Sequence, residues 1–139
     1  MAEAQKTARQ ERSAAITVSS ILFYIAGFGL PIGIPPITLF IIQNRELPVL
    51  FGVRLFCCGF IESLGLDAII VSSLLLVAVS PLEIVAGYWL WKSLKKGGKL
   101  GIILLPIEMV FGIGFVDSMI LVIGPLKAIL IGVGWKTLR

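Results

Sequence analysis

Histidine does not occur in this sequence, and cysteine occurs only twice, as the neighbours Cys57 and Cys58. The missing histidine excludes Ser/His/Asp and Cys/His catalytic sets, because both use an imidazole as the base. Two adjacent cysteines give no disulfide framework and no zinc-type spacing. A strained vicinal disulfide or a soft-metal site is conceivable, but two small apolar side chains on a partly buried helix are the simpler interpretation. We expect no catalytic residue, no metal site and no cofactor in this chain.

Charged residues are also scarce: they make up 14% of the 139 residues, whereas 58% are hydrophobic. Soluble domains are roughly 45–50% apolar. The mean hydropathy is +1.03, and the longest apolar runs could not all be buried in the core of a soluble protein of this size. The sequence therefore predicts an all-α integral membrane protein with a single domain and about four transmembrane helices.

Four apolar segments predict these helices, at residues 13–43, 66–91, 100–116 and 119–135. The first contains three prolines and several glycines between residues 27 and 36, so it is either kinked or ends near Gly33. Asp117 and Ser118 separate the last two segments, which predicts a tight hairpin of two short helices. Residues 1–12 form a charged tail that does not resemble a cleaved signal peptide, and we expect it to be cytoplasmic.

The segment 48–65 lies between the first two predicted helices and carries Arg54 and Glu62. Its apolar part, 49–65, has 17 residues, which is the minimum for crossing a membrane. We expect this segment to be an interfacial or re-entrant amphipathic helix that does not span the bilayer.

The distribution of basic residues predicts the orientation. With four spans and a cytoplasmic N-terminus, nine basic residues lie on the cytoplasmic side and two, Arg45 and Arg54, lie outside. The nine are Lys6, Arg9, Arg12, Lys92, Lys95, Lys96, Lys99, Lys136 and Arg139. If segment 48–65 also crossed, the lysine-rich loop would be external and this bias would disappear. We therefore expect a multi-pass protein of the cell membrane with both termini in the cytoplasm.

Residues near the cytoplasmic boundary of the membrane are expected to contact its surface. In the loop KSLKKGGK, a solvated loop that touches lipid headgroups is a simpler interpretation than a nucleic-acid surface. The headgroup-contacting residues would be Lys92, Lys95, Lys96 and Lys99. Aromatic rings favour the same level, and the expected interfacial anchors are Tyr88, Trp89, Trp91 and Trp135.

Two stretches of the sequence echo each other: PLEIVAGYWLWK at 81–92 and PLKAILIGVGWK at 125–136. Each has a charge at its third position, Glu83 in the first and Lys127 in the second. These two residues, and Glu108 in the segment between them, each lie nine residues from a lysine at the predicted cytoplasmic boundary of the membrane: Lys92, Lys136 and Lys99, respectively. At about 1.5 Å per residue they share a depth of roughly 13–14 Å, near the middle of a core about 30 Å thick. A lone charge is costly there, so the spacing predicts an ion-paired triad on three different helices.

Proline precedes each of these residues by two positions, as Pro81, Pro106 and Pro125. A proline inside a span frees a backbone carbonyl, so these positions predict helix kinks that neighbouring helices can satisfy. The two glutamates exceed the one lysine by one negative charge. We expect one glutamate to be protonated, shared, or paired to another subunit or ion.

The segment 82–104 resembles the corresponding region of DoxX-like and uncharacterised families of small four-helix prokaryotic membrane proteins. The sequence as a whole resembles archaeal membrane proteins. The matching positions are Glu83, Gly87, Tyr88, Trp91 and the turn 95–98. The resemblance covers about 49–139 and implies an accessory role beside quinol-oxidising membrane complexes. No catalytic residue of that family can be carried over to this chain.

Three functions are consistent with these features, and the first two belong to different classes. The first is a non-catalytic accessory subunit of a larger membrane enzyme complex, such as an archaeal respiratory oxidase or a copper-dependent ammonia monooxygenase. In that case the triad locks helices or clamps a partner, and the partners are other membrane subunits and lipids, with no nucleic acid. The alternative is a small oligomeric transporter or channel that uses Glu83, Glu108 and Lys127 as its intramembrane site. A third option is a redox accessory protein that binds quinone or lipid beside Trp89 and Trp91.

Overall fold

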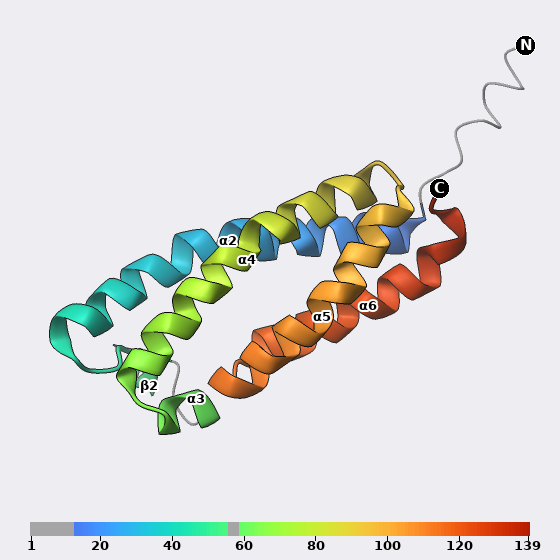
Figure 1. Cartoon of the computed structure of the whole chain (residues 1–139). Helices are drawn as coiled ribbons and strands as arrows, with labels where there is room; N and C mark the ends of the chain where they lie inside the picture. The colour runs from blue at the N-terminus through green and yellow to red at the C-terminus, as the bar shows by residue number, and fades with distance from the viewer. Residues whose placement is uncertain (1–12, 56–58) are drawn as a thin grey trace, which may run out of the picture.

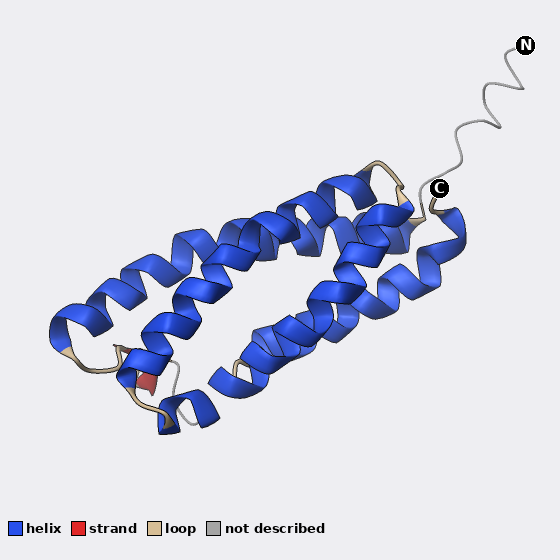
Figure 2. Ribbon diagram, in the orientation of Figure 1, coloured by secondary structure: helices blue, strands red, loops and turns tan. Residues whose placement is uncertain are grey.

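The structure is a computed structural model that describes residues 13–55 and 59–139, and this part of the chain is almost entirely helical (Figure 2). Its long helices are α2 (Ala14–Asn44), α4 (Leu66–Trp91), α5 (Lys95–Phe115) and α6 (Ser118–Gly134), and the 3-10 helix η1 (Trp135–Thr137) follows α6. Four helices in the described residues are long and apolar enough to cross a membrane. The chain is a multi-pass, all-α membrane protein, as the sequence predicted.

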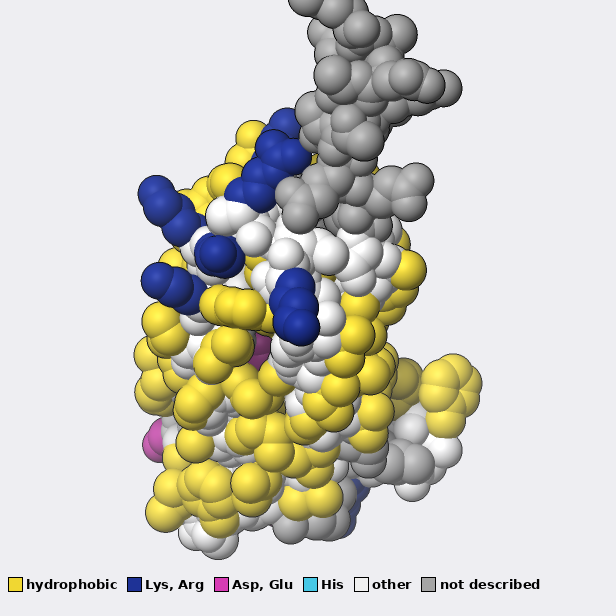
Figure 3. Space-filling view, turned by 90° about the vertical axis from the view of Figure 1, so that its right-hand side faces the viewer, with side chains coloured by type: hydrophobic (Ala, Val, Ile, Leu, Met, Phe, Trp, Pro, Cys, Tyr) yellow, Lys and Arg dark blue, Asp and Glu magenta, His cyan; other side chains and the backbone are white. Residues whose placement is uncertain are grey.

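The four long helices form a ring in which α2 packs against α4, α4 against α5, α5 against α6, and α6 against α2. Figure 1 shows the start of α2, the α4–α5 turn and the C-terminus at one end of the bundle. We call this the basic end, and Figure 3 shows Lys and Arg side chains gathered there above a largely hydrophobic surface. Among the described residues, the exposed basic ones at this end are Lys92, Lys95, Lys96, Lys99, Lys136 and Arg139. That this end faces the cytoplasm stays a prediction.

The first predicted span does not end near Gly33. Helix α2 is continuous over 31 residues and includes Pro31, Pro35 and Pro36. Membrane helices tolerate internal proline because neighbouring helices and local adjustments satisfy the freed backbone groups. Helix α2 starts with the Ser13 hydroxyl accepting a hydrogen bond from the Ala15 N–H, and it ends at Arg45 in the left-handed conformation.

The segment between α2 and α4 does not cross the bundle, but the expectation of one amphipathic helix in it was wrong. Strands β1 (Val49–Leu50) and β2 (Val53–Arg54) form an antiparallel hairpin, and the one-turn helix α3 (Phe60–Ser63) follows. The hairpin turn has φ +51° at Phe51 and +82° at Gly52. Two positive φ values in a two-residue turn match the twist of paired strands, and glycine permits the second of them, at position 52. We call the end of the bundle with this hairpin the hairpin end. Cys57 and Cys58 lie outside the described residues, as does the tail 1–12.

Helix α5 begins at Lys95, five residues before the predicted start at 100, so the lysine-rich stretch is largely helical. Gly97 allows the first turn of α5 to pack closely against the backbone of α4. A Cβ on Gly97 would lie 2.6 Å from the nitrogen of Leu90. The C-terminus completes the same turn. The Lys95 N–H donates to the Arg139 carbonyl, and the Arg139 N–H donates to the Ser93 carbonyl, both at 2.8 Å.

Two hydrophobic clusters fill the interior of the ring. The cluster at the basic end contains Ile16, Phe23, Ala86, Leu90, Leu104, Ile131 and Leu138. The cluster at the hairpin end contains Ile34, Ile41, Ile61, Ile69, Leu76 and Phe115. The charged residues Glu83, Glu108 and Lys127 are buried in the same bundle, and they define the candidate site.

Candidate intramembrane binding site

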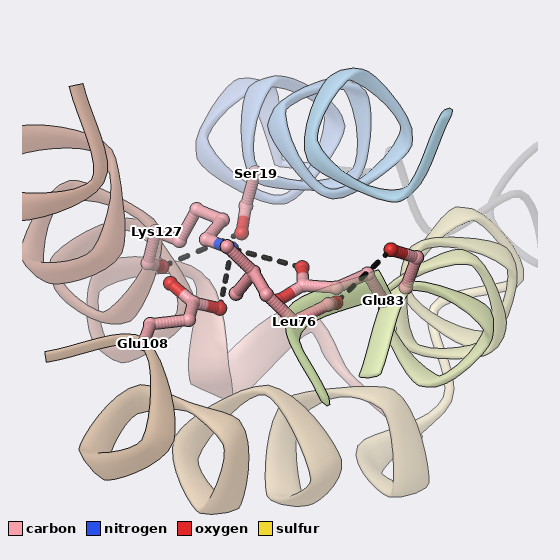
Figure 4. Close-up of polar contacts among 6 residues, drawn as sticks. Ser19, Leu76, Glu83, Glu108 and Lys127 are labelled. Atoms are coloured by element: carbon pink, nitrogen blue, oxygen red, sulfur yellow. Dashed lines mark hydrogen bonds and ion pairs between the residues drawn. The ribbon is translucent and has the colours of Figure 1, made fainter. Parts of the chain in front are cut away.

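Lys127 lies at the centre of a buried charge cluster that joins three helices. Its Nζ donates to Glu83 Oε2 on α4 at 2.9 Å and to Glu108 Oε1 on α5 at 2.6 Å. Figure 4 shows the lysine reaching between the two carboxyl groups. The exposed fractions of the three side chains are 2% for Glu83, 9% for Glu108 and 3% for Lys127. The structure thus brings together the three residues that the depth count placed in one layer.

The fourth helix, α2, also contributes to this cluster. Lys127 Nζ lies 4.2 Å from the ring centroid of Phe23, within the range of a cation–π interaction. The Ser19 hydroxyl donates to the Lys127 carbonyl at 3.4 Å (Figure 4). One ammonium therefore contacts two carboxylates and an aromatic face, which together compensate for its burial.

Gly124 on α6 makes room for the second carboxylate. A Cβ at this position would lie 3.0 Å from Glu108 Oε2. That carboxylate oxygen therefore rests against the backbone of α6, one turn before Lys127. A side chain at position 124 would require the Glu108 carboxyl group to shift.

The charges of the triad do not balance. When both carboxyl groups are ionised, Glu83, Glu108 and Lys127 carry one net negative charge. Such an imbalance is costly in a membrane interior, because neither water nor a high dielectric compensates for it. The balancing positive charge must come from a proton or from a cation outside this set.

A cavity of about 770 Å³ borders the triad on the side of the hairpin end. All four long helices line it, mainly with apolar side chains and glycines, among them Gly29, Gly33, Leu76, Val79, Ile107 and Ile123. Glu83, Glu108 and Lys127 lie in its wall in mid-bundle, and Arg54 and Asp117 line it near the hairpin end. The volume lies within the range of about 300–1,000 Å³ typical of small-molecule sites.

The cavity also has a side opening between α2 and α6. Ile25 of α2 and Met119 of α6 both line the cavity, yet they are 55% and 67% exposed on the outside of the bundle. Helices α2 and α6 are close toward the basic end, where Ser19 reaches Lys127 and a Cβ on Gly134 would collide with Ile16. The seam between them therefore opens beyond the triad, toward the space that lipid chains occupy in a membrane.

The basic end of the bundle is closed by close packing. On this side of the triad, Gly101 is buried against Phe23, and Gly98 is buried against Trp135. Gly87 lies against α2, where the Ser20 hydroxyl donates to its carbonyl at 2.7 Å. The cavity is therefore one-sided: it extends from the triad to the hairpin end only.

The remaining predicted site residues lie away from the cavity. The helices continue through Pro81, Pro106 and Pro125, so none of these prolines ends a span. The predicted anchors Tyr88, Trp89, Trp91 and Trp135 all lie at the basic end, where Trp135 packs against the interior cluster. Of the predicted headgroup-contacting lysines, Lys92 lies 5.8 Å from the ring centroid of Tyr88. Their roles in binding lipid stay predictions.

Sequence reasoning missed Ser19 and Phe23. A signal for both exists, because Ser19, Ser20, Phe23 and Gly27 recur at the spacing of one helical face in α2. Gly124 is a glycine in an apolar span, which indicates close helix packing, but the sequence did not show that Glu108 of another helix lies beside it. The cavity could not be predicted from the sequence at all.

Residues 13–55 and 59–139 bring no three His, Cys, Asp or Glu side chains together in a way that could hold a metal ion. The site is therefore described by its own carboxyl and ammonium groups and by the apolar cavity beside them. Comparisons with family models, with curated proteins and with solved structures found no match for this chain. The resemblance to DoxX-like proteins stays an expectation, and what is established is a membrane protein of four helices.

Proposed function

We propose that this protein is a small membrane carrier that binds its substrate in the cavity between the four helices. The observation that supports this most directly is the position of the triad, which forms part of the wall of a cavity of about 770 Å³. Charged groups that only hold helices together would be enclosed by packed side chains. Here the three groups instead lie in the wall of a cavity, and Glu108 is the most exposed of them at 9%.

The one-sided shape of the cavity supports a carrier over a channel. A channel needs a continuous path across the membrane, whereas the bundle is tightly packed between the triad and the basic end. A carrier exposes its central site to one side at a time, and such sites commonly lie near the middle of the bilayer. The conformation described here would be the one that is open toward the hairpin end.

Filling the cavity tests this proposal. Gly33 lines the cavity, and nothing lies within 4 Å of a Cβ built on it. Gly33→Trp should therefore fold normally and obstruct the cavity. The measurement is photolabelling in nanodiscs with an adamantyl diazirine, followed by peptide mass spectrometry. Leu76 and Phe115 are each only 3% exposed but line the cavity, so their labelling reports cavity access. We expect their labelling to fall roughly tenfold, equivalent to about 1.4 kcal/mol of binding.

Gly132→Trp is the matched control, because Gly132 also has open space around a Cβ but does not line the cavity. In Gly132→Trp, Leu76 and Phe115 should be labelled to the same extent as in the wild type. Val71, which is 57% exposed on the outside of α4, should be labelled equally in all three proteins. Absence of labelling at Leu76 and Phe115 in the wild type would refute a ligand-accessible cavity.

A role as accessory subunit is the second candidate, and the hairpin favours it. Val49, Leu50 and Phe51 are 59%, 54% and 97% exposed at one end of the bundle. A projecting apolar hairpin is typical of a surface that a lipid boundary or another protein covers. A larger membrane complex would supply such a surface.

Native extraction tests this second candidate. After mild detergent solubilisation of the source membranes, an accessory subunit should comigrate with large catalytic subunits in native gels and native mass spectrometry. Replacing Phe51 with Ser should release it from them, because the exposed ring would lose most of its buried contact area. Migration of the wild-type chain only as monomers or homo-oligomers would reject the accessory role and leave the carrier proposal intact.

A further inference from the structure

We infer that the cavity takes a lipophilic monocation, with its positive group at Glu83 and Glu108 and its apolar body along the cavity wall. This rests on the proposed function and specifies its substrate class. The bound cation would replace a proton that otherwise balances the triad, so cation and proton would compete for the same carboxyl groups.

The net charge of the site favours a cation. In the described part of the chain, the charged residues that line the cavity are Glu83 on α4, Glu108 on α5, Asp117 and Lys127 at the two ends of its α6 side, and Arg54 of the hairpin. Helix α2 contributes no charged residue to this lining. With both glutamates ionised, the triad is one positive charge short, and Lys127 already uses its ammonium on both carboxylates and on Phe23. An anion would add a second unbalanced negative charge to the same buried site.

The shape of the site favours a molecule that is both apolar and charged. A bare inorganic cation would have to exchange its water shell for the few oxygens that the triad offers, and most of the cavity wall is apolar. An organic cation carries its own apolar body, which gains from burial along Gly29, Leu76 and Ile123.

The side opening between α2 and α6 suits the same class of molecule. Amphiphilic cations collect in the bilayer, and the exposed cavity residues Ile25 and Met119 mark a route from the lipid chains into the cavity. Such a molecule can reach Glu108 without crossing the packed basic end. Glu108 is the more exposed of the two carboxylates, at 9% against 2% for Glu83.

Two probes of the same shape test the inference: phenethyltrimethylammonium, which is a cation at every pH, and its neutral isostere (3,3-dimethylbutyl)benzene. Binding is measured by calorimetry on the whole chain in phosphatidylcholine nanodiscs, with empty nanodiscs subtracted. The cation should bind at least about tenfold more tightly than the neutral isostere. Glu108→Gln should remove most of this preference, because it takes away the excess negative charge. Asp67→Asn is the control of equal charge change, since Asp67 is exposed, pairs with Arg45 and does not line the cavity.

Wild-type protein provides a second readout that does not depend on a variant folding. In weakly buffered solution, binding of the permanent cation should release up to about one proton per site, and its affinity should fall as the pH is lowered. Equal binding of the two probes would overturn the inference but leave an apolar carrier. Cation binding without proton release, or unchanged in Glu108→Gln, would place the cation elsewhere and overturn the inference. Failure of both probes to bind would overturn the inference and would also contradict the carrier proposal.

Discussion

Lys127→Met should destabilise the protein by about 3–5 kcal/mol, the cost typical of removing one partner from a buried ion pair. The substitution keeps the length and the apolar stem of the side chain, so it leaves little cavity. It removes the ammonium that binds Glu83 at 2.9 Å and Glu108 at 2.6 Å, and it leaves two carboxyl groups facing each other in the bilayer core. The measurement is the free energy of unfolding in mixed micelles with increasing dodecyl sulfate.

Partial restoration distinguishes an electrostatic loss from a packing loss. Lys127→Met combined with Glu83→Gln should be more stable than Lys127→Met alone, because the double variant leaves one buried acid in place of two. Ser80→Ala is a local control. Ser80 is buried on α4, the helix that carries Glu83, and its hydroxyl donates to the Leu76 carbonyl of the same helix. Strictly additive losses for Lys127→Met and Glu83→Gln would show that the two charges do not interact.

Gly97→Ala should cost about 2 kcal/mol of stability, even though alanine is the better helix former. Gly97 lies in the first turn of α5, where a Cβ would meet three backbone atoms of α4 at 2.6 to 2.9 Å, belonging to Leu90, Ala86 and Trp89. Backbone atoms cannot rotate away as a side chain can. The α4–α5 turn would therefore have to open, and the loss should appear in the same unfolding assay.

Gly132→Ala is the matched control for this prediction, because nothing lies within 4 Å of a Cβ at Gly132 on α6. This variant should be neutral or gain up to about 1 kcal/mol from the better helix propensity of alanine. Similar stability changes in the two variants would mean that α4 and α5 are not in close contact at Gly97. The cavity is on the other side of the triad, so Gly97→Ala should leave the labelling of Leu76 unchanged in the folded fraction.

Much of the fold could be predicted from the sequence because membrane solvation imposes simple rules. Apolar segments of sufficient length predicted four spans, and the observed helices α4 (Leu66–Trp91) and α6 (Ser118–Gly134) begin and end within about one residue of the predicted bounds. The hairpin between β1 and β2 was missed because a short apolar segment with two charges fits an amphipathic helix as well as a pair of strands. Its turn at Phe51 and Gly52 is decided by backbone angles that composition does not reveal.

The sequence by itself determined that the chain spans a membrane and that Glu83, Glu108 and Lys127 share one depth. Both follow from one-dimensional quantities, hydropathy and residue spacing, because a helix in a bilayer converts position in the chain into depth. Only the tertiary structure decided which faces of the helices meet. Helices that are apolar all round give no preferred face, so the contact of Phe23 with Lys127, the close approach of α6 to Glu108 at Gly124, and the cavity beside them arise from packing in three dimensions.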